Sequence, residues 1–249
     1  MGELNGLPAI VTGGSSGIGA EVVRMLAERG AVVASFDLQP PKSPSSPGLT
    51  VDCDVRSTES VTAAVDQVVS QFGAVDILIN NAGIGAQGTV ADNTDEEWAR
   101  LFDVNVIGIA RMTRAALPHL RRSSAASIVN TSSVVANIGL PNRALYGATK
   151  GAVQSLTLAM AADHLPDGIR VNCVTPGTTD TPWVARLLDA APDATAERHA
   201  LASRQPLGRL ISPLEVASAI VYLASPASNS TTGTSLPVDG GLSSLRLPR

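Results

Sequence analysis

Apolar segments of strand length alternate with longer helical patterns from the start of the chain to about residue 175. Continuous apolar runs, in place of a strict alternation of apolar and polar residues, are typical of strands buried on both faces. Parallel strands need long crossover connections, which helices commonly provide. The pattern therefore predicts an α/β fold, with a doubly wound parallel sheet and helices on both of its faces.

The expected elements follow from the lengths of these segments. Strands are expected at Ala9–Thr12, Ala31–Phe36, Leu49–Asp52, Val75–Asn80, Ala126–Thr131, Arg170–Thr175 and Thr234–Val238. Helices are expected at Ala20–Arg29, Ser57–Phe72, Asp95–His119, Tyr146–His164 and Pro213–Ala224. Four prolines between Gln39 and Gly48 exclude a regular helix, so a surface loop should join two strands there. Residues 178–212 have a looser pattern and are expected to form a helical flap over the substrate.

Composition narrows the class of protein. The 249 residues are 44% apolar and 16% charged, which fits one domain over residues 1–249 with a large core. A net charge of −4 argues against a nucleic-acid partner. The sequence has no run of 18 apolar residues and begins without a secretory signal, so we expect a cytoplasmic protein with no membrane contact. Cys53 and Cys173 are isolated and are interpreted as small buried residues, not as metal ligands.

A glycine-rich turn joins the first expected strand to the first expected helix. The segment from Thr12 to Gly19 reads TGGSSGIG. Glycines allow the backbone to turn sharply and to approach a ligand closely, and the N–H groups that begin a helix favour a diphosphate. This turn predicts a dinucleotide site, although a glycine-rich turn alone is weak evidence.

A single acidic residue indicates which dinucleotide would bind. Asp37 ends the second expected strand, eighteen residues after Gly19. A carboxylate at this place accepts hydrogen bonds from a ribose 2′-hydroxyl and repels a 2′-phosphate. Neither the glycine turn nor Leu38 offers a basic side chain for that phosphate. The sequence therefore favours NAD over NADP.

One tyrosine and one lysine stand four residues apart, at Tyr146 and Lys150. Residues at i and i+4 share one face of a helix. An ammonium beside a phenol favours the phenolate, so we expect the pKa of Tyr146 to move from about 10 toward neutrality. Such a phenol could exchange a proton with an alcohol or a carbonyl.

Together these motifs make the chain resemble the short-chain dehydrogenases/reductases of single-domain type. The resemblance covers about residues 7–241 and includes the glycine turn, the Asn80-Asn81-Ala82-Gly83 strand end and the Tyr-x-x-x-Lys pair. It implies a seven-stranded Rossmann sheet, NAD-linked oxidation or reduction at a CH–OH group, no metal, and a homotetramer or homodimer. The implied catalytic residues are Asn105, Ser133, Tyr146 and Lys150.

The resemblance also assigns roles to individual residues. Ser133 would steady the charge on the substrate oxygen, and Asn105 would hold a water that links Lys150 to a proton relay. The expected contacts to the cofactor are Gly13, Ser15, Ser16, Gly17, Ile18, Gly19, Asp37, Asp54, Val55, Asn81, Gly83, Tyr146, Lys150, Pro176, Gly177, Thr179 and Thr181. Subunits would join through the two helices that carry these motifs. There, Val153, Leu156 and Ala159 fit either a partner surface or the core.

The substrate is the least constrained part of the prediction. Three segments should determine it: Ile84–Thr94, Val134–Arg143 and the flap, in which Trp183, His199 and Arg204 could read a hydroxylated ligand. The flap resembles relatives that act on sugars or sugar acids, such as L-fucose and 2-keto-3-deoxy-fuconate dehydrogenases. Two alternatives stay open: a 3-oxoacyl-[acyl carrier protein] reductase, and a non-catalytic dinucleotide-binding regulator.

Overall fold

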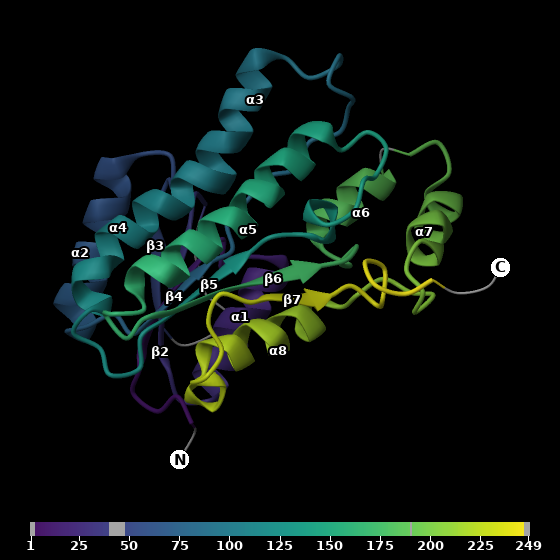
Figure 1. Ribbon diagram of the computed structural model, residues 1–249. Helices are drawn as coiled ribbons and strands as arrows, with labels where there is room; N and C mark the ends of the chain where they lie inside the picture. The colour runs from purple at the N-terminus through teal and green to yellow at the C-terminus, as the bar shows by residue number, and fades with distance from the viewer. Residues whose placement is uncertain (1–2, 40–47, 190, 247–249) are drawn as a thin grey trace.

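A parallel sheet of seven strands forms the centre of the molecule (Figure 1). The computed structural model of the chain describes residues 3–39, 48–189 and 191–246. The strands are β1 (Pro8–Thr12), β2 (Val32–Asp37), β3 (Leu49–Asp52), β4 (Ile77–Asn80), β5 (Ser127–Thr131), β6 (Arg170–Pro176) and β7 (Ser235–Val238). Their order is β3-β2-β1-β4-β5-β6-β7, and every pairing is parallel. The predicted doubly wound, seven-stranded Rossmann sheet is confirmed.

Helices lie on both faces of this sheet, as Figure 1 shows. The helices are α1 (Gly17–Glu28), α2 (Thr58–Phe72), α3 (Asp95–Phe102), α4 (Gly108–Leu120), α5 (Ala144–His164), α6 (Pro182–Asp189), α7 (Ala194–Ser203) and α8 (Pro213–Ala224). Helices α2, α4 and α5 pack on one face, and α1 and α8 pack on the other. The strand order reverses between β1 and β4, and ligands of open α/β sheets bind beyond the carboxyl ends of the strands at such a point.

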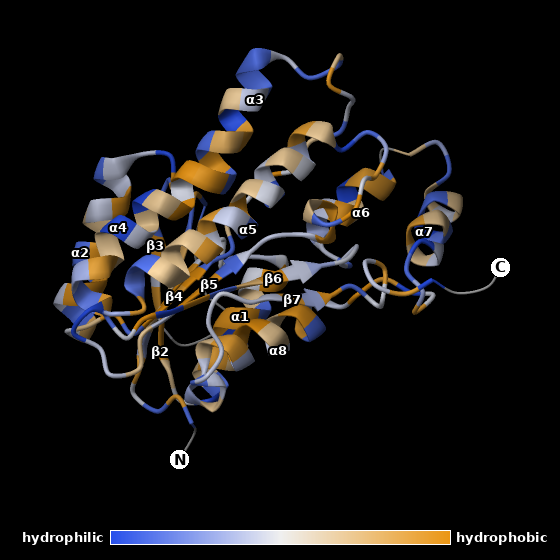
Figure 2. Ribbon diagram, viewed as in Figure 1, coloured by the Kyte–Doolittle hydropathy of each residue, from blue (hydrophilic) through white to orange (hydrophobic). Residues whose placement is uncertain are grey.

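Two apolar cores explain why the strands are continuously apolar. In β1, Ile10 packs into the core under α2, α4 and α5, whereas Ala9 and Val11 pack into the core under α1 and α8. Figure 2 shows apolar residues concentrated on the strands and on the helices that cover them. Because each strand is buried on both sides, no polar alternation survives in its sequence.

Local signals in the sequence fix the helix ends. The Ser57 hydroxyl accepts a hydrogen bond from the Ser60 N–H at the start of α2, and Gly73 ends that helix with a φ of 81°. Helix α8 begins with a reciprocal capping box between Ser212 and Glu215. These starts agree with the predicted ones to within one residue.

The single helix expected at Asp95–His119 was wrong. It is divided into α3 and α4 by a π-helical turn, Asp103–Ile107. The side chain of Asn105, in this turn, is fully buried and bonds to the backbone of Ile84. The sequence does not reveal this turn, because residues 103–107 contain neither a proline nor a glycine that would mark an interruption of the helix. π-Turns occur frequently at functional sites.

Two predictions about loops have different outcomes. Most of the proline-rich segment falls at residues 40–47, which lie outside the described residues. The segment from 178 to 212 contains α6 and α7 and follows the carboxyl end of β6.

Within the described residues, no helix is both long enough and apolar enough to span a membrane.

Candidate active site

The glycine turn lies beyond the carboxyl end of β1 and is tightly packed. Gly13 and Gly17 have φ angles of 65° and 53°, in the left-handed region that favours glycine. At Gly19, an added Cβ would overlap the carbonyl oxygen of Gly13. The turn therefore excludes side chains at the positions where the backbone must approach a ligand.

Polar groups of this turn remain available for a ligand. The buried Ser15 hydroxyl has no hydrogen-bond partner among the described residues. Ser16 caps α1 in an extended conformation without a side-chain hydrogen bond, and the first turn of α1 carries no acidic residue. A buried hydroxyl without a partner beside open helix N–H groups fits a diphosphate. Both observations support the predicted dinucleotide site.

Asn81 holds this turn against the neighbouring strand. Its side-chain amide donates to the carbonyls of Thr12 and Gly13, at 3.2 Å each. The Thr12 hydroxyl in turn accepts from the N–H groups of Asn81 and Ala82, at 3.0 Å each. Asn81 was expected beside the adenosine half of the cofactor; its amide also secures the backbone that would carry the diphosphate.

The residues expected at the adenosine end lie at the carboxyl ends of β2 and β3, which are adjacent strands. Asp37 ends β2, and its carboxylate accepts a hydrogen bond from the Ser15 N–H at 3.2 Å. Asp54 is paired with Arg56 at 2.7 Å, and hydrogen bonds from Arg56 lower the pKa of that carboxyl. Val55 lies against the start of α4, where a Cβ at Gly108 would come within 3.0 Å of its side chain.

Three elements bring the predicted catalytic side chains together. Ser133 lies two residues beyond the end of β5, and its side chain is close enough to the Tyr146 phenol to lower the pKa of that group. Tyr146 and Lys150 lie in the first two turns of α5. The neighbouring Ser132 is used differently: its buried hydroxyl donates to the Lys150 carbonyl at 2.8 Å. Ser133, not Ser132, therefore faces the tyrosine.

Lys150 is buried between α5 and β5. Its Nζ donates to the Thr131 carbonyl at 2.9 Å and lies 5.7 Å from the centre of the Tyr146 ring. The side chain is only 4% exposed. Burial lowers the pKa of Lys150 to about 8, because an ammonium group is disfavoured away from water.

The expectation that the pKa of Tyr146 moves toward neutrality was wrong for the protein alone. Burial raises the pKa of the phenol, although hydrogen bonding with Ser133 and the positive charge of Arg143 act in the opposite direction. The ring keeps some exposed surface, but desolvation still dominates. Lys150 has little influence, because its ammonium is directed to the Thr131 carbonyl. Sequence spacing placed the pair on one helix face but could not orient the ammonium.

Asn105 links the site to two neighbouring elements. Its side-chain oxygen accepts from the Ile84 N–H at 2.9 Å, and its amide donates to the Ile84 carbonyl and to the Thr149 hydroxyl. Thr149 precedes Lys150 on α5. The Asn105 side chain thus holds the segment after β4 against the helix that carries Tyr146.

The segment after β6 reaches the glycine turn. The Thr181 methyl group lies 3.4 Å from the position of a Cβ at Gly17, and the Thr179 hydroxyl donates to the Gly177 carbonyl at 3.2 Å. The buried Gln205 donates from Nε2 to the carbonyls of Thr178 and Arg209. Gln205 was missed by the sequence analysis, since an isolated glutamine in a flap carries no signal. It ties the flap to the segment expected to hold the nicotinamide.

Trp183 forms a wall beside the catalytic tyrosine. Its ring stacks on that of Tyr146, with the centroids 6.5 Å apart and the planes inclined by 27°. A Cβ at Gly85 would come within 2.5 Å of Trp183 Cζ2, so the absence of a side chain at Gly85 is what makes room for the indole. The indole also packs against the small apolar core of the flap. Trp183, predicted from the sequence as a residue that could read a ligand, therefore also packs the flap onto the site. The role of Gly85 was not predicted.

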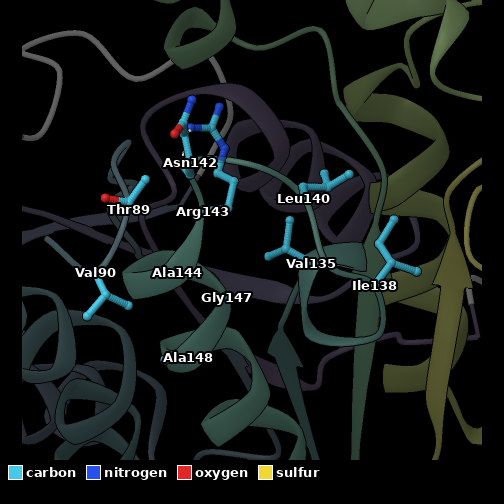
Figure 3. Close-up of a pocket in the computed structure, with 11 residues that line it drawn as sticks. Thr89, Val90, Val135, Ile138, Leu140, Asn142, Arg143, Ala144, Gly147 and Ala148 are labelled. Atoms are coloured by element: carbon cyan, nitrogen blue, oxygen red, sulfur yellow. Dashed lines mark hydrogen bonds between the residues drawn. The ribbon is translucent and has the colours of Figure 1, made fainter. Parts of the chain in front are cut away.

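A cavity of about 420 Å³ adjoins this centre (Figure 3). It is lined by two of the three segments expected to determine the substrate, Ile84–Thr94 and Val134–Arg143, and by the start of α5. The lining residues are Thr89, Val90, Val135, Ile138, Gly139, Leu140, Asn142, Arg143, Ala144, Gly147 and Ala148. Tyr146 does not line it but lies in the same helical turn. Arg143 is the polar, ionised group on its rim, and the sequence analysis assigned it no role. His199 and Arg204 are exposed on and directly after α7.

The described residues contain no group of three or more His, Cys, Asp or Glu side chains that could hold a metal ion. Cys53 and Cys173 are free and buried, as predicted. Burial raises the pKa of the Cys53 thiol to about 11, which disfavours the reactive thiolate.

A Rossmann sheet with an open diphosphate cradle, beside a serine–tyrosine–lysine set, defines a dinucleotide-dependent oxidoreductase. A family model described as "Enoyl-(Acyl carrier protein) reductase" matches residues 13–243. The chain belongs to the short-chain dehydrogenases/reductases, which act on CH–OH groups with a nicotinamide dinucleotide.

Similar proteins with characterised activities span nearly the whole chain. Cis-4-hydroxycyclohexanecarboxylate dehydrogenase of Sinomonas cyclohexanicum is 39% identical, covering 94% of this chain and 95% of that protein. L-fucose dehydrogenase of Bos taurus is 40% identical, covering 95% and 89%. The 2-keto-3-deoxy-L-fuconate dehydrogenase of Xanthomonas campestris is 36% identical, covering 97% and 81%.

Solved structures agree with the fold. Thermoplasma acidophilum aldohexose dehydrogenase superposes with a TM-score of 0.92 at 34% identity, covering 99% of both chains. The 3-ketoacyl-(acyl-carrier-protein) reductase of Brucella melitensis, complexed with NADH, gives a TM-score of 0.87 at 35% identity and covers 96% of this chain and 99% of that one.

Proposed function

We propose that the chain is an NAD-dependent dehydrogenase that interconverts a secondary alcohol and its ketone, with a cyclic alcohol, sugar or sugar acid as substrate. The observation that carries this proposal is the position of the Tyr146 phenol, beside the Ser133 hydroxyl and within one helical turn of the buried Lys150. These groups lie at the same edge of the sheet as the glycine turn, where a dinucleotide would bind.

Each catalytic residue has a proposed task. Ser133 donates a hydrogen bond to the substrate oxygen, and Tyr146 gives a proton to that oxygen in reduction or takes it in oxidation. A phenol is protonated at neutral pH, and burial favours this form further by raising the pKa of Tyr146; the protonated form is the one that donates. Asn105 uses its side chain to bind Ile84 and Thr149, so a relay water would be held by its main-chain carbonyl.

The cofactor would lie along the carboxyl edge of the sheet. When bound, its nicotinamide supplies the hydride chemistry, and the protein supplies orientation and the proton. We assign its contacts to the residues predicted from the sequence: Gly13, Ser15, Ser16, Gly17, Ile18, Gly19, Asp37, Asp54, Val55, Asn81, Gly83, Tyr146, Lys150, Pro176, Gly177, Thr179 and Thr181. The unpartnered Ser15 hydroxyl and the bare Gly19 support this path.

The preference for NAD rests on Asp37. Its carboxylate is anchored by the Ser15 N–H, which orients it beside the glycine turn. There it could accept hydrogen bonds from a ribose 2′-hydroxyl and would repel a 2′-phosphate. NADH in the related Brucella reductase supports the same cofactor for this chain.

Replacing Asp37 with alanine should lower the ratio of kcat/KM with NAD to kcat/KM with NADP about 10- to 100-fold. The change removes charge-assisted hydrogen bonds to the ribose, which are worth about 1.5–3 kcal/mol. The measurement is kcat/KM with each cofactor. Asp52→Ala is a matched control, because Asp52 is the register partner of Asp37 on β3 and is exposed. An unchanged ratio in Asp37→Ala would remove this residue from the ribose site.

The relatives support a hydroxylated substrate that is a cyclic alcohol, a sugar or a sugar acid. A cyclohexane carboxylic acid, L-fucose and a deoxy sugar acid are named for three of them. A 3-oxoacyl-[acyl carrier protein] reductase remains the alternative, supported by the Brucella structure. Asp37 disfavours a reductase of this kind that uses NADPH, since a carboxylate there opposes the 2′-phosphate. It does not oppose one that uses NADH, the cofactor in the Brucella structure. A non-catalytic regulator is disfavoured by the intact serine, tyrosine and lysine.

A substrate panel distinguishes these three functions. We expect oxidation of cyclic secondary alcohols or sugars with NAD, followed as NADH absorbance, at rates well above those with NADP. Preferential reduction of a 3-oxoacyl thioester with NADPH would support the reductase. Cofactor binding without turnover of any alcohol or carbonyl would support the regulator.

We also propose one domain over residues 1–249, with residues 178–212 as the substrate-binding flap, and a homotetramer or homodimer formed through α4 and α5. Leu158 and Ala159 are exposed on α5 and support such an interface. Val153 is completely buried and belongs to the core; Leu156 packs against the same core and stays partly exposed.

A further inference from the structure

Arg143 is a positively charged group placed at the catalytic centre without a structural partner. It immediately precedes α5, three residues before Tyr146, and it lines the cavity beside that helix (Figure 3). The only hydrogen bond of its side chain among the described residues goes to the carbonyl of the adjacent Asn142, at 3.1 Å. It forms no ion pair there with any carboxylate.

Arg204 carries a second positive charge, on the flap. It follows α7, is exposed, and likewise forms no ion pair within the described residues. Two nearby arginines behave differently: Arg198 pairs with Asp180, and Arg209 pairs with Glu215. Those two pairs hold the flap together, whereas the charge of Arg204 is not used in this way.

The charge of Arg204 acts on Arg143. Burial and this charge lower the pKa of Arg143, while Tyr146 and Glu197 oppose that shift. Like charges held close together destabilise a protein unless an anion lies between them. Glu197 offsets part of this repulsion, and a bound anion would offset the rest.

We infer that the substrate is a hydroxy acid, or the matching keto acid, whose carboxylate is bound by Arg143 and Arg204 while its hydroxyl-bearing carbon lies at Tyr146. Arginine is suited to this task because its planar fork matches a carboxylate. The indole of Trp183, stacked on Tyr146, would pack against the apolar part of the substrate between the two ends. This inference rests on the proposed dehydrogenase function and specifies its substrate class.

The test compares a charged substrate with a neutral one of nearly the same shape. Suitable probes are cis-4-hydroxycyclohexanecarboxylate, its methyl ester and cyclohexanol, each oxidised with NAD. We expect kcat/KM for the acid to exceed that for the ester by about 10- to 100-fold, the value of one or two charge-assisted hydrogen bonds. Arg143→Gln and Arg204→Gln should each lower kcat/KM for the acid about tenfold more than for the ester.

Arg198→Gln is the matched control, because Arg198 is on α7 but is already paired with Asp180. It should change the acid and the ester by the same factor. A measurement on the unaltered protein avoids dependence on the folding of variants: cyclohexanecarboxylate should inhibit cyclohexanol oxidation competitively, and cyclohexanecarboxamide should inhibit it at least tenfold more weakly.

Two outcomes separate this inference from the function on which it rests. Turnover of cyclohexanol and of the ester, with no preference for the acid and equal inhibition by the carboxylate and the amide, would overturn carboxylate recognition alone. Absence of turnover with every secondary alcohol and NAD would overturn the dehydrogenase function itself.

Discussion

Replacing Tyr146 with phenylalanine should lower kcat about 10²- to 10⁴-fold, the range that a positioned proton donor contributes. The change removes one oxygen atom and preserves the ring that stacks on Trp183. The glycine turn, Asp37 and Asn81 are untouched. We therefore expect the dissociation constant for NADH to rise by no more than about fivefold, the value of one neutral hydrogen bond.

The chain provides its own control, since it contains one other tyrosine. Tyr222 is exposed on α8, on the face of the sheet opposite to α5. Tyr222→Phe should keep the turnover of the unaltered protein. The measurements are initial rates from NADH absorbance and NADH binding by fluorescence titration. If Tyr146→Phe retained turnover within tenfold, Tyr146 would not be the proton donor.

The sequence was sufficient for those parts of the fold that depend on local patterns. Continuous apolar strands follow from burial on both faces, and the caps at Ser57 and Ser212 are encoded within four residues. The π-turn that carries Asn105 was not predictable, because its stabilising partners, Ile84 and Thr149, are distant in sequence. The spacing of apolar residues along a helix does not indicate which distant residues its polar side chains will bond to.

The same distinction applies to the site. Tyr146 and Lys150 lie on one helix face, as i and i+4 spacing requires. The direction of the Lys150 ammonium, however, depends on the Thr131 carbonyl of a neighbouring strand. Three further residues depend on distant parts of the chain. Gly85 makes room for Trp183, Gln205 bonds to Thr178, and Arg143 lines a cavity formed by several segments. Their roles were visible only once the segments that follow β4, β5 and β6 were placed side by side.

Lys150 connects catalysis with stability. Burial lowers its pKa from 10.5 to about 8, so the ammonium is less stable in the folded chain than in the unfolded one. A difference of this size corresponds to about 3 kcal/mol of destabilisation at neutral pH. Below pH 8 both states bind the proton and the cost is fully present. Between pH 8 and 10.5 only the unfolded state keeps the proton, so the folded protein gains stability as the pH rises.

Lys150→Met should therefore remove catalysis without reducing stability. The variant loses the hydrogen bond to the Thr131 carbonyl, at a cost of about 1–2 kcal/mol, but no longer buries an ammonium. We expect its thermal midpoint at pH 7, without cofactor, to equal or exceed that of the unaltered protein, by about 2–4 °C for each kcal/mol gained. Turnover should fall at least about 10²-fold, because Lys150 is proposed to hold the nicotinamide ribose beside Tyr146, and a misplaced cofactor loses the geometry that hydride transfer needs.

The pH dependence of unfolding decides whether the buried charge is the cause. The difference between the midpoints of Lys150→Met and the unaltered protein should become smaller from pH 7 to pH 9.5, as the buried ammonium loses its proton. Gln154→Met, one turn further along α5, is the matched control and should show a pH-independent difference. The opposite result would be a lower midpoint for Lys150→Met at pH 7, with a difference that does not change at higher pH. It would mean that Lys150 stabilises the fold and that burying its ammonium costs no stability.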